Sequence, residues 1–187
     1  MRRVLLVLGT RPDIIKLGPV YRALARQPDV AVETFWTGQH IELADGLLEL
    51  FDISITHKAT DVLEHARLTG KASAMLSRFS ELLGKTRYDY IVVQGDTLTA
   101  MAGAIAGFLE RVPVAHIEAG LRTHDLYSPW PEEFARRVVT VVTRIPPLRF
   151  AVAITAARPE YLPLRTYKTS PGRSFMIARS TGSSRPV

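Results

Sequence analysis

Two carboxylates in the middle of the sequence stand where they could act as an acid and a base. Asp96 directly follows the apolar run YDYIVVQG, and Glu118 follows the apolar run VPVAHI. Carboxylates at the ends of neighbouring strands are suited to acid–base chemistry, because the charge of each one changes the proton affinity of the other. The sequence leaves open that Asp96 only caps the following helix.

A third acidic segment, PEEFARRVV, is predicted to be a helix that begins at Pro131. Glu132 and Arg136 are four residues apart, as are Glu133 and Arg137, so each pair shares a helix face. The helix dipole also favours acids early and bases late in an ordinary helix. Spacing alone therefore predicts two solvated ion pairs.

The turn GTRP, residues 9–12, could bind an anion. Arg11 stands at the predicted start of a helix, where backbone N–H groups and the helix dipole attract phosphate or carboxylate, and Lys16 follows about one turn later. The turn lacks both the GxGxxG pattern of dinucleotide-binding folds and the Walker A pattern. A surface arginine at a turn is the alternative interpretation.

His40 in TGQH and His116 in AHIEAG could each act as a base. A histidine beside a strand is more often a hydrogen-bonded structural residue, and that alternative stays open for both. No second histidine lies at metal-binding spacing and the chain has no cysteine, so neither a metal nor a cofactor is predicted.

Alternating apolar runs and segments of helical period must position these residues. Strands are expected at 3–9, 30–38, 53–59, 88–96 and 112–120, and helices at 13–26, 41–51, 61–85, 98–110 and from Pro131. This alternation predicts an α/β fold, a Rossmann-like doubly wound parallel sheet covered on both faces. Ligands bind at the carboxyl ends of the strands in such sheets, where GTRP, TGQH, QGDT and HIEAGLRT all fall.

The helical period also predicts which side chains face the sheet. In the helix at 13–26, Ile14, Ile15 and Leu17 belong to the apolar stripe, and in the segment 61–85, Leu63 and Phe79 point inward.

Composition limits the class of protein. A chain of 187 residues with 47% hydrophobic content can form one large domain, expected here at residues 1–143. Residues 144–187 form a Pro- and Arg-rich tail with at most one strand near 150–154, and this tail carries seven Arg and one Lys against one Glu, more than the whole net charge of +6. Because no aromatic residues interleave with the basic ones, nucleic-acid binding is not expected. No apolar stretch approaches the ~20 residues that span a bilayer, so no membrane partner and a cytoplasmic location are expected.

Taken together, the motifs LGTRPDIIK, TGQH, LLELFDI, QGDT, HIEAGLRT and DLYSPWPEE resemble, in this order, the non-hydrolysing UDP-N-acetylglucosamine 2-epimerases of bacteria. The resemblance covers residues 3 to about 143. It implies that this part is the N-terminal Rossmann-like domain of a two-domain, GT-B-like fold.

The resemblance also implies a reaction. Members of this family interconvert UDP-N-acetylglucosamine and UDP-N-acetylmannosamine for polysaccharide biosynthesis, by elimination of UDP and its re-addition to 2-acetamidoglucal. The family's catalytic carboxylates fall on Asp96, Glu118 and Glu132, and its assisting arginine falls on Arg136.

The substrate-binding positions that the resemblance implies come from three further motifs. Arg11 and Lys16 match the cleft-lining residues of GTRPDIIK, and Arg122 belongs to HIEAGLRT. Gln39 and His40 match positions near the regulatory nucleotide site of some members.

The chain also departs from the family pattern. Members hold the UDP moiety chiefly through a C-terminal domain that has no counterpart here, the pattern stops near Thr143, and Ala135 stands where members usually have Asn. The expectation is a truncated half-enzyme with low or no activity alone. The alternative is a non-catalytic module that binds a nucleotide sugar or docks as a homodimer or on a full-length epimerase subunit. A hydrolysing relative and a glycosyltransferase of the same architecture are less favoured by the motifs.

Overall fold

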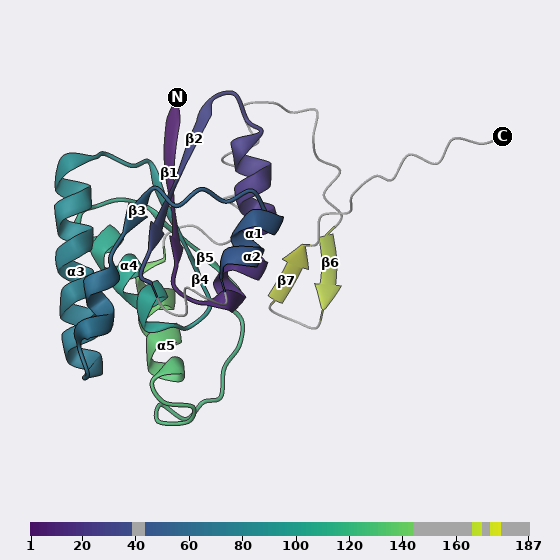
Figure 1. Ribbon diagram of the computed structural model, residues 1–187. Helices are drawn as coiled ribbons and strands as arrows, with labels where there is room; N and C mark the ends of the chain where they lie inside the picture. Colours follow the sequence, from purple (N-terminus) through teal and green to yellow (C-terminus); the bar gives the residue numbers. More distant parts are fainter. Residues whose placement is uncertain (39–43, 144–165, 170–172, 177–187) are drawn as a thin grey trace. The chain divides into compact units, whose positions relative to one another are not determined.

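The computed structural model describes residues 1–38, 44–143, 166–169 and 173–176 (Figure 1). Strands and helices alternate along the chain as far as Val142. The strands are β1 (Arg2–Leu8), β2 (Val30–Trp36), β3 (His57–Lys58), β4 (Tyr90–Gln94) and β5 (Val114–Ile117). The helices are α1 (Arg11–Ala25), α2 (Asp45–Leu50), the 3₁₀ helix η2 (Thr60–Glu64), α3 (Leu68–Lys85), α4 (Leu98–Leu109) and α5 (Glu132–Val142).

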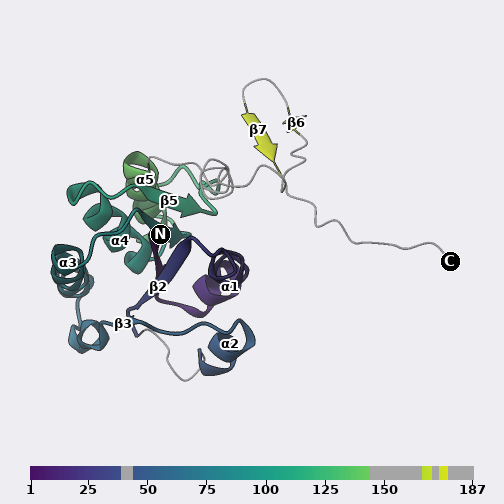
Figure 2. The ribbon, with the colours of Figure 1, turned by 90° about the horizontal axis from the view of Figure 1, so that it is seen from above.

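These five strands form one parallel sheet in the order β3-β2-β1-β4-β5. The central strand β1 pairs with β2 on one side and with β4 on the other, so that Leu5 stands opposite both Glu33 and Ile91. Figure 2 shows α1 and α2 on one face of the sheet and α3, α4 and α5 on the other. The expected doubly wound, Rossmann-like α/β fold is confirmed.

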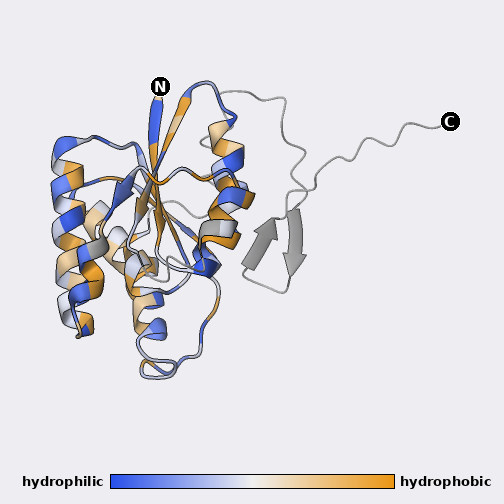
Figure 3. Ribbon diagram, in the orientation of Figure 1, coloured by the Kyte–Doolittle hydropathy of each residue, from blue (hydrophilic) through white to orange (hydrophobic). Residues whose placement is uncertain are grey.

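A large hydrophobic core cluster lies between the sheet and the α3–α4 layer. Val4 to Leu8 of β1 are all buried, which explains why this strand is apolar without alternation. Phe35 of β2 stacks on Phe79 of α3, with ring centroids 4.1 Å apart. The apolar strands and the polar outer helix faces are visible in Figure 3. Within the described residues, no helix is long and apolar enough to cross a membrane.

Several expected details differ in the structure. The strand expected at 53–59 is reduced to two paired residues, and the expected helix at 61–85 is divided into η2 and α3. Leu63 is 44% exposed and Ile15 is 46% exposed, so their predicted inward orientation was wrong. The tighter 3₁₀ turn brings Val62 to the core in place of Leu63, and in α1 the neighbouring Ile14 already occupies the buried face.

The chain divides into two compact units, Met1–Pro147 and Leu148–Val187. The second unit contains an antiparallel hairpin of β6 (Thr166–Thr169) and β7 (Arg173–Met176), in which Tyr167 pairs with Phe175. This hairpin was not among the expected elements, although TYKT and RSFM contain residues that favour strands. The strand expected near 150–154 lies outside the described residues.

Candidate functional site

The carboxyl ends of β4 and β5 place two of the predicted carboxylates side by side. Gly95 follows β4 with φ +66°, and Glu118 follows β5 with φ +62°, so both strands end in a sharp turn. The Gly95 N–H donates to the Ile117 carbonyl over 2.9 Å. A Cβ atom built on Gly95 would lie 3.9 Å from Oε2 of Glu118. The Asp96 turn and the Glu118 carboxylate are therefore neighbours at this edge of the sheet.

Asp96 is bound by an arginine of α5. Its Oδ2 atom accepts a hydrogen bond from the guanidinium of Arg136, whose side chain is only 6% exposed against 26% for Asp96. The cap of α4 is provided by Thr97, whose Oγ1 accepts from the Ala100 N–H over 3.1 Å. Thr97 therefore caps the helix, and Asp96 instead forms an ion pair with Arg136 in the turn after β4.

Glu133 is fully buried behind this pair. It accepts from Arg136 over 2.8 Å and from Arg137 over 3.0 Å. The Thr123 N–H donates to it over 3.2 Å. Burial alone would raise the pKa of Glu133, but these three donors lower it to about 2. Of the two predicted i,i+4 pairs, Glu133 with Arg137 is formed, but Glu133 is buried and not solvated. The other prediction was wrong, because Arg136 turns inward to Asp96 and to Glu133, three residues before it.

Glu118 is held by two other segments. Its Oε2 atom forms an ion pair with Lys16 of α1 and accepts a hydrogen bond from the side-chain amide of Gln94, the last residue of β4. The Glu118 side chain remains 33% exposed. Gln94 was not among the predicted site residues, although an amide at the end of an apolar strand is a signal that could have identified it.

Glu132 begins α5, one turn before Arg136. Its Oε2 atom is buried and has no hydrogen-bond partner among the described residues. A buried acceptor without a donor is costly, so such an atom is available to a proton, a water molecule or a ligand. Of the three predicted carboxylates, Glu132 is therefore the one with the fewest hydrogen bonds to other described residues.

Arg122 fastens the loop between β5 and α5. Its guanidinium donates to the Ala119 carbonyl over 2.9 Å and to Thr140 Oγ1 of α5 over 2.7 Å. In the same loop, Thr123 Oγ1 donates to the Ser128 carbonyl over 2.5 Å. Arg122 was predicted to bind substrate, and these contacts show that it also connects the loop to α5.

The GTRP turn is followed directly by a buried carboxylate, Asp13, which was not among the predicted site residues. Asp13 is 2% exposed, and its Oδ2 accepts from the N–H groups of Gly9 and Thr10 over 2.9 and 2.8 Å. Burial raises the pKa of Asp13 to about 6 against these hydrogen bonds. Its place in the first turn of α1, where acids cap backbone N–H groups, was the available signal. Arg11, the first residue of α1, is exposed.

His116 is completely buried in β5, and its Nε2 donates to the Gly95 carbonyl over 2.6 Å. Burial lowers the pKa of His116, and the charges of Arg122 and Arg136 add to this effect. These contacts favour the structural interpretation of this histidine over a role as a base. Gln39 and His40 lie outside the described residues.

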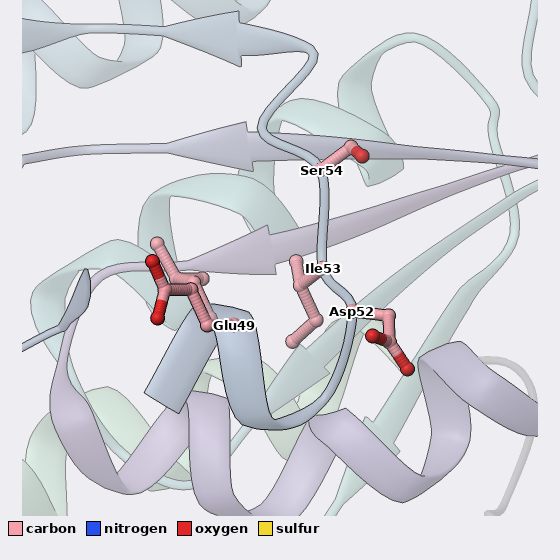
Figure 4. A pocket seen from close by; sticks show the side chains of 5 residues that line it. Glu49, Asp52, Ile53 and Ser54 are labelled. Atoms are coloured by element: carbon pink, nitrogen blue, oxygen red, sulfur yellow. The ribbon is translucent and has the colours of Figure 1, made fainter. Parts of the chain in front are cut away.

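A surface pocket beside α2 is separate from the predicted site residues and has an acidic lining. It is lined by Leu48, Glu49, Asp52, Ile53 and Ser54 (Figure 4), none of which is a predicted site residue. Asp52 is paired with Arg22 over 2.7 Å. Two carboxylates in its lining do not suit a phosphate-containing ligand. Within the described part of the chain, no group of three or more His, Cys, Asp or Glu side chains could hold a metal ion.

The arrangement at the ends of β4 and β5 can therefore move protons beside fixed positive charge. Asp96 and Glu118 each face solvent in part, and each is held by one cation, Arg136 or Lys16. Such a pair of carboxylates can remove a proton from one position of a ligand, while the cations stabilise negative charge on a departing group.

Comparison with known proteins identifies relatives over most of the chain. A family model described as UDP-N-acetylglucosamine 2-epimerase matches residues 22–157. The UDP-N-acetylglucosamine 2-epimerase of Escherichia coli K12 is 42% identical over 138 residues, which are 74% of this chain and 36% of that protein. The enzyme of Neisseria meningitidis is 38% identical over 142 residues, 76% of this chain and 38% of that protein.

Solved structures show the same relationship. The crystal structure of UDP-GlcNAc 2-epimerase from Neisseria meningitidis bound to UDP-GlcNAc superposes with a TM-score of 0.73 at 38% identity, over 76% of this chain and 39% of that one. The S. aureus MnaA–UDP co-structure superposes with a TM-score of 0.74 at 31% identity, over 86% of this chain and 43% of that one. The chain thus spans well under half the length of these relatives.

Proposed function

Because the chain belongs to the UDP-N-acetylglucosamine 2-epimerase family, we propose that its first 143 residues carry the proton-transfer groups for epimerisation at C2 of UDP-N-acetylglucosamine. The observation that carries the proposal is the meeting of Asp96 and Glu118 at the ends of β4 and β5, each beside a cation. The relatives crystallised with UDP-GlcNAc or UDP support the choice of ligand.

The proposed reaction is an elimination followed by a re-addition. A carboxylate removes the proton from C2, the electron pair of that bond forms the C1–C2 double bond of 2-acetamidoglucal, and the bond from C1 to the UDP oxygen breaks. Return of a proton to the opposite face of C2, with re-addition of UDP at C1, gives UDP-N-acetylmannosamine. Atoms and charge balance without an oxidant or a cofactor.

The predicted residues divide these tasks among them. Asp96, Glu118 and Glu132 are the proposed acids and bases, and Arg136 orients Asp96. Arg11 and Lys16 are the proposed cations for the pyrophosphate, with Arg122, Gln39 and His40 as further substrate-binding residues. Lys16 would then share its charge between Glu118 and the ligand. A nucleotide-sugar substrate also fits the expected cytoplasmic location.

The decisive experiment is NMR of the purified chain with millimolar UDP-N-acetylglucosamine in D₂O. Reversible proton removal introduces deuterium at C2 even where net conversion is small, and the same spectra show UDP-N-acetylmannosamine, free UDP and free N-acetylmannosamine. Asp96→Asn is the control variant. Deuterium incorporation that is lost in Asp96→Asn supports the proposal. Binding of the nucleotide sugar by a folded chain, with no exchange at C2, contradicts a catalytic function of this chain alone.

A second candidate function is a module that docks on another subunit. One observation favours it: aromatic side chains are exposed around the start of α5. Tyr127 is 76% exposed, Trp130 61% and Phe134 44%. Exposed aromatic clusters are typical of protein interfaces. Sedimentation of the chain alone, and mixed with a full-length epimerase of the same family, distinguishes a homodimer, a mixed dimer and a monomer.

A further inference from the structure

Glu133 has no role in the proposed proton transfers, yet it is the most completely buried carboxylate beside the site. Its side chain is 0% exposed and accepts hydrogen bonds from three donors in two segments of the chain. Taking a carboxylate out of water is costly unless charged partners compensate. The role of this buried anion must therefore lie in the groups that it binds.

What Glu133 holds is the arginine that binds Asp96. One terminal nitrogen of Arg136 donates to Glu133 over 2.8 Å, and the other donates to Asp96. A guanidinium is planar, so fixing one of its nitrogens fixes the direction of the other. Since the Arg136 side chain is 6% exposed, water cannot readily replace Glu133 as its partner.

Glu133 also holds the loop that follows Glu118. The Thr123 N–H donates to the same Oε2 atom that receives Arg136. One carboxylate oxygen thereby joins the loop after β5 to the arginine that orients the carboxylate after β4. Loss of its negative charge weakens both connections together.

We propose that Glu133 is a positioning residue, a buried anion that aligns Arg136 on Asp96 and ties the loop at Thr123 to α5. This inference rests on the proposed function for its catalytic meaning, although the alignment itself is a property of the chain. Glu133 acts through Arg136 and does not touch the substrate.

The test is the NMR spectrum of the Arg136 side chain in the ¹⁵N-labelled protein. In the wild-type chain, bonds to both Glu133 and Asp96 restrict rotation of the guanidinium, so its two terminal nitrogens give separate resonances. In Glu133→Gln these resonances merge, and the Thr123 N–H exchanges about tenfold faster, because a bond to a charged acceptor becomes a bond to a neutral one. Separate Arg136 resonances that persist in a folded Glu133→Gln chain overturn the inference.

Arg137→Gln is the matched control. Arg137 binds the other oxygen of Glu133, over 3.0 Å, and its side chain is 44% exposed. Its replacement also removes one charged partner of Glu133, but it leaves Arg136 and Thr123 in contact with the carboxylate. The Arg136 resonances stay separate in this variant, and merging there would overturn the inference, because any disturbance of α5 would then suffice.

The wild-type spectrum is itself a test if Glu133→Gln does not fold: a single averaged Arg136 resonance in the folded wild-type chain overturns the inference. Failure of the proposed function is read separately, from deuterium incorporation at C2 of UDP-N-acetylglucosamine. A chain without that exchange but with the expected Arg136 signals contradicts a catalytic function of this chain alone and keeps the alignment. Exchange without the expected signals disproves the alignment alone.

Discussion

Two groups of side chains on the same sheet hold carboxylates in different ways. The first, the Glu33 cluster, consists of Glu33, Arg3, His57 and Tyr88. Glu33 receives Arg3 on one oxygen over 2.7 Å, and His57 and Tyr88 on the other over 2.8 and 2.5 Å. The second is the site at the ends of β4 and β5. There both hydrogen bonds described for Glu118 end on a single oxygen.

The difference separates a structural carboxylate from one available for chemistry. In the Glu33 cluster, burial is offset by hydrogen bonds to Tyr88, His57 and Arg3, which together lower the pKa of Glu33. Burial, together with the same contact with Glu33, raises the pKa of Tyr88 far above its usual value. The side chain of Glu33 is 16% exposed, half the value for Glu118. A ligand can reach Glu118 without first displacing a complete set of donors.

The largest effect is expected on activity, from a substitution at the site and not in the Glu33 cluster. Glu118→Gln should lower the rate of deuterium incorporation at C2 by about 100- to 1,000-fold, because the amide cannot exchange a proton as the carboxylate does. Urea unfolding of this variant should stay close to wild type, since the side chain is partly exposed. A rate within about tenfold of wild type would remove Glu118 from the proposed acid–base pair.

A second prediction concerns Asp13, a buried carboxylate in the first turn of α1. The pKa of Asp13 is about 6 in the folded chain and 3.8 as its ordinary value. Between these values the folded state binds more protons, so stability falls as pH rises from about 4 to about 6. The fall should amount to about 3 kcal/mol and should disappear in Asp13→Asn.

The measurement is urea unfolding between pH 4 and pH 7.5. The side-chain amide introduced by Asp13→Asn keeps an oxygen for the Gly9 and Thr10 N–H groups, so the variant should be more stable than wild type above pH 6. Asp29→Asn, at an exposed aspartate, should keep the wild-type profile and serves as the control. A profile that is the same in the Asp13 variant and the wild type would rule out Asp13 as its source.

A third prediction concerns the Glu33 cluster. Glu33→Gln should destabilise the chain by about 2 kcal/mol at pH 7, because bonds to a charged acceptor become weaker and one oxygen becomes a donor. The rate of exchange at C2 should be unchanged. Glu81→Gln is the control, since its exposed pair with Arg78 should contribute under about 1 kcal/mol. Lost activity with unchanged stability in Glu33→Gln would reverse the distinction between the two regions.

The smallest effect is expected at the turn that presents Asp96. Gly95 has φ +66°, and its nearest contact for an added Cβ is Glu118 at 3.9 Å, so Gly95→Ala should cost about 1 kcal/mol from backbone strain alone. Gly84→Ala is a useful contrast, because this exposed glycine of α3 has open space and should be stabilised by about 0.5 to 1 kcal/mol. Thermal unfolding of both variants measures whether each substitution lowers or raises the melting temperature. Equal shifts would show that the turn at Gly95 is not strained by a side chain.

Sequence reasoning succeeded where local patterns decide the structure. Continuous apolar runs located β1, β4 and β5, and the rule for the carboxyl ends of parallel strands placed Asp96 and Glu118 close together. It failed for Glu133 and Asp13, whose burial depends on contacts with Thr123 and with the Gly9 turn that no helical period encodes. The partner of Arg136 was mistaken for the same reason: the i,i+4 rule describes an isolated helix, whereas Asp96 comes from the turn after β4.

The position of β1 at the centre of the sheet has a consequence for biosynthesis. Among the strands of this sheet, β1 is synthesised before the others, and β2 can pair with it soon afterwards, but Val4 to Leu6 also pair with Tyr90 to Val92. One edge of a strand that is apolar from Val4 to Leu8 therefore remains open until Tyr90 to Val92 have left the ribosome. Pairings so distant along the chain form slowly, and open apolar edges associate with one another. The yield of native chain should therefore depend more on chaperones and on a low protein concentration than on the stability of the folded domain.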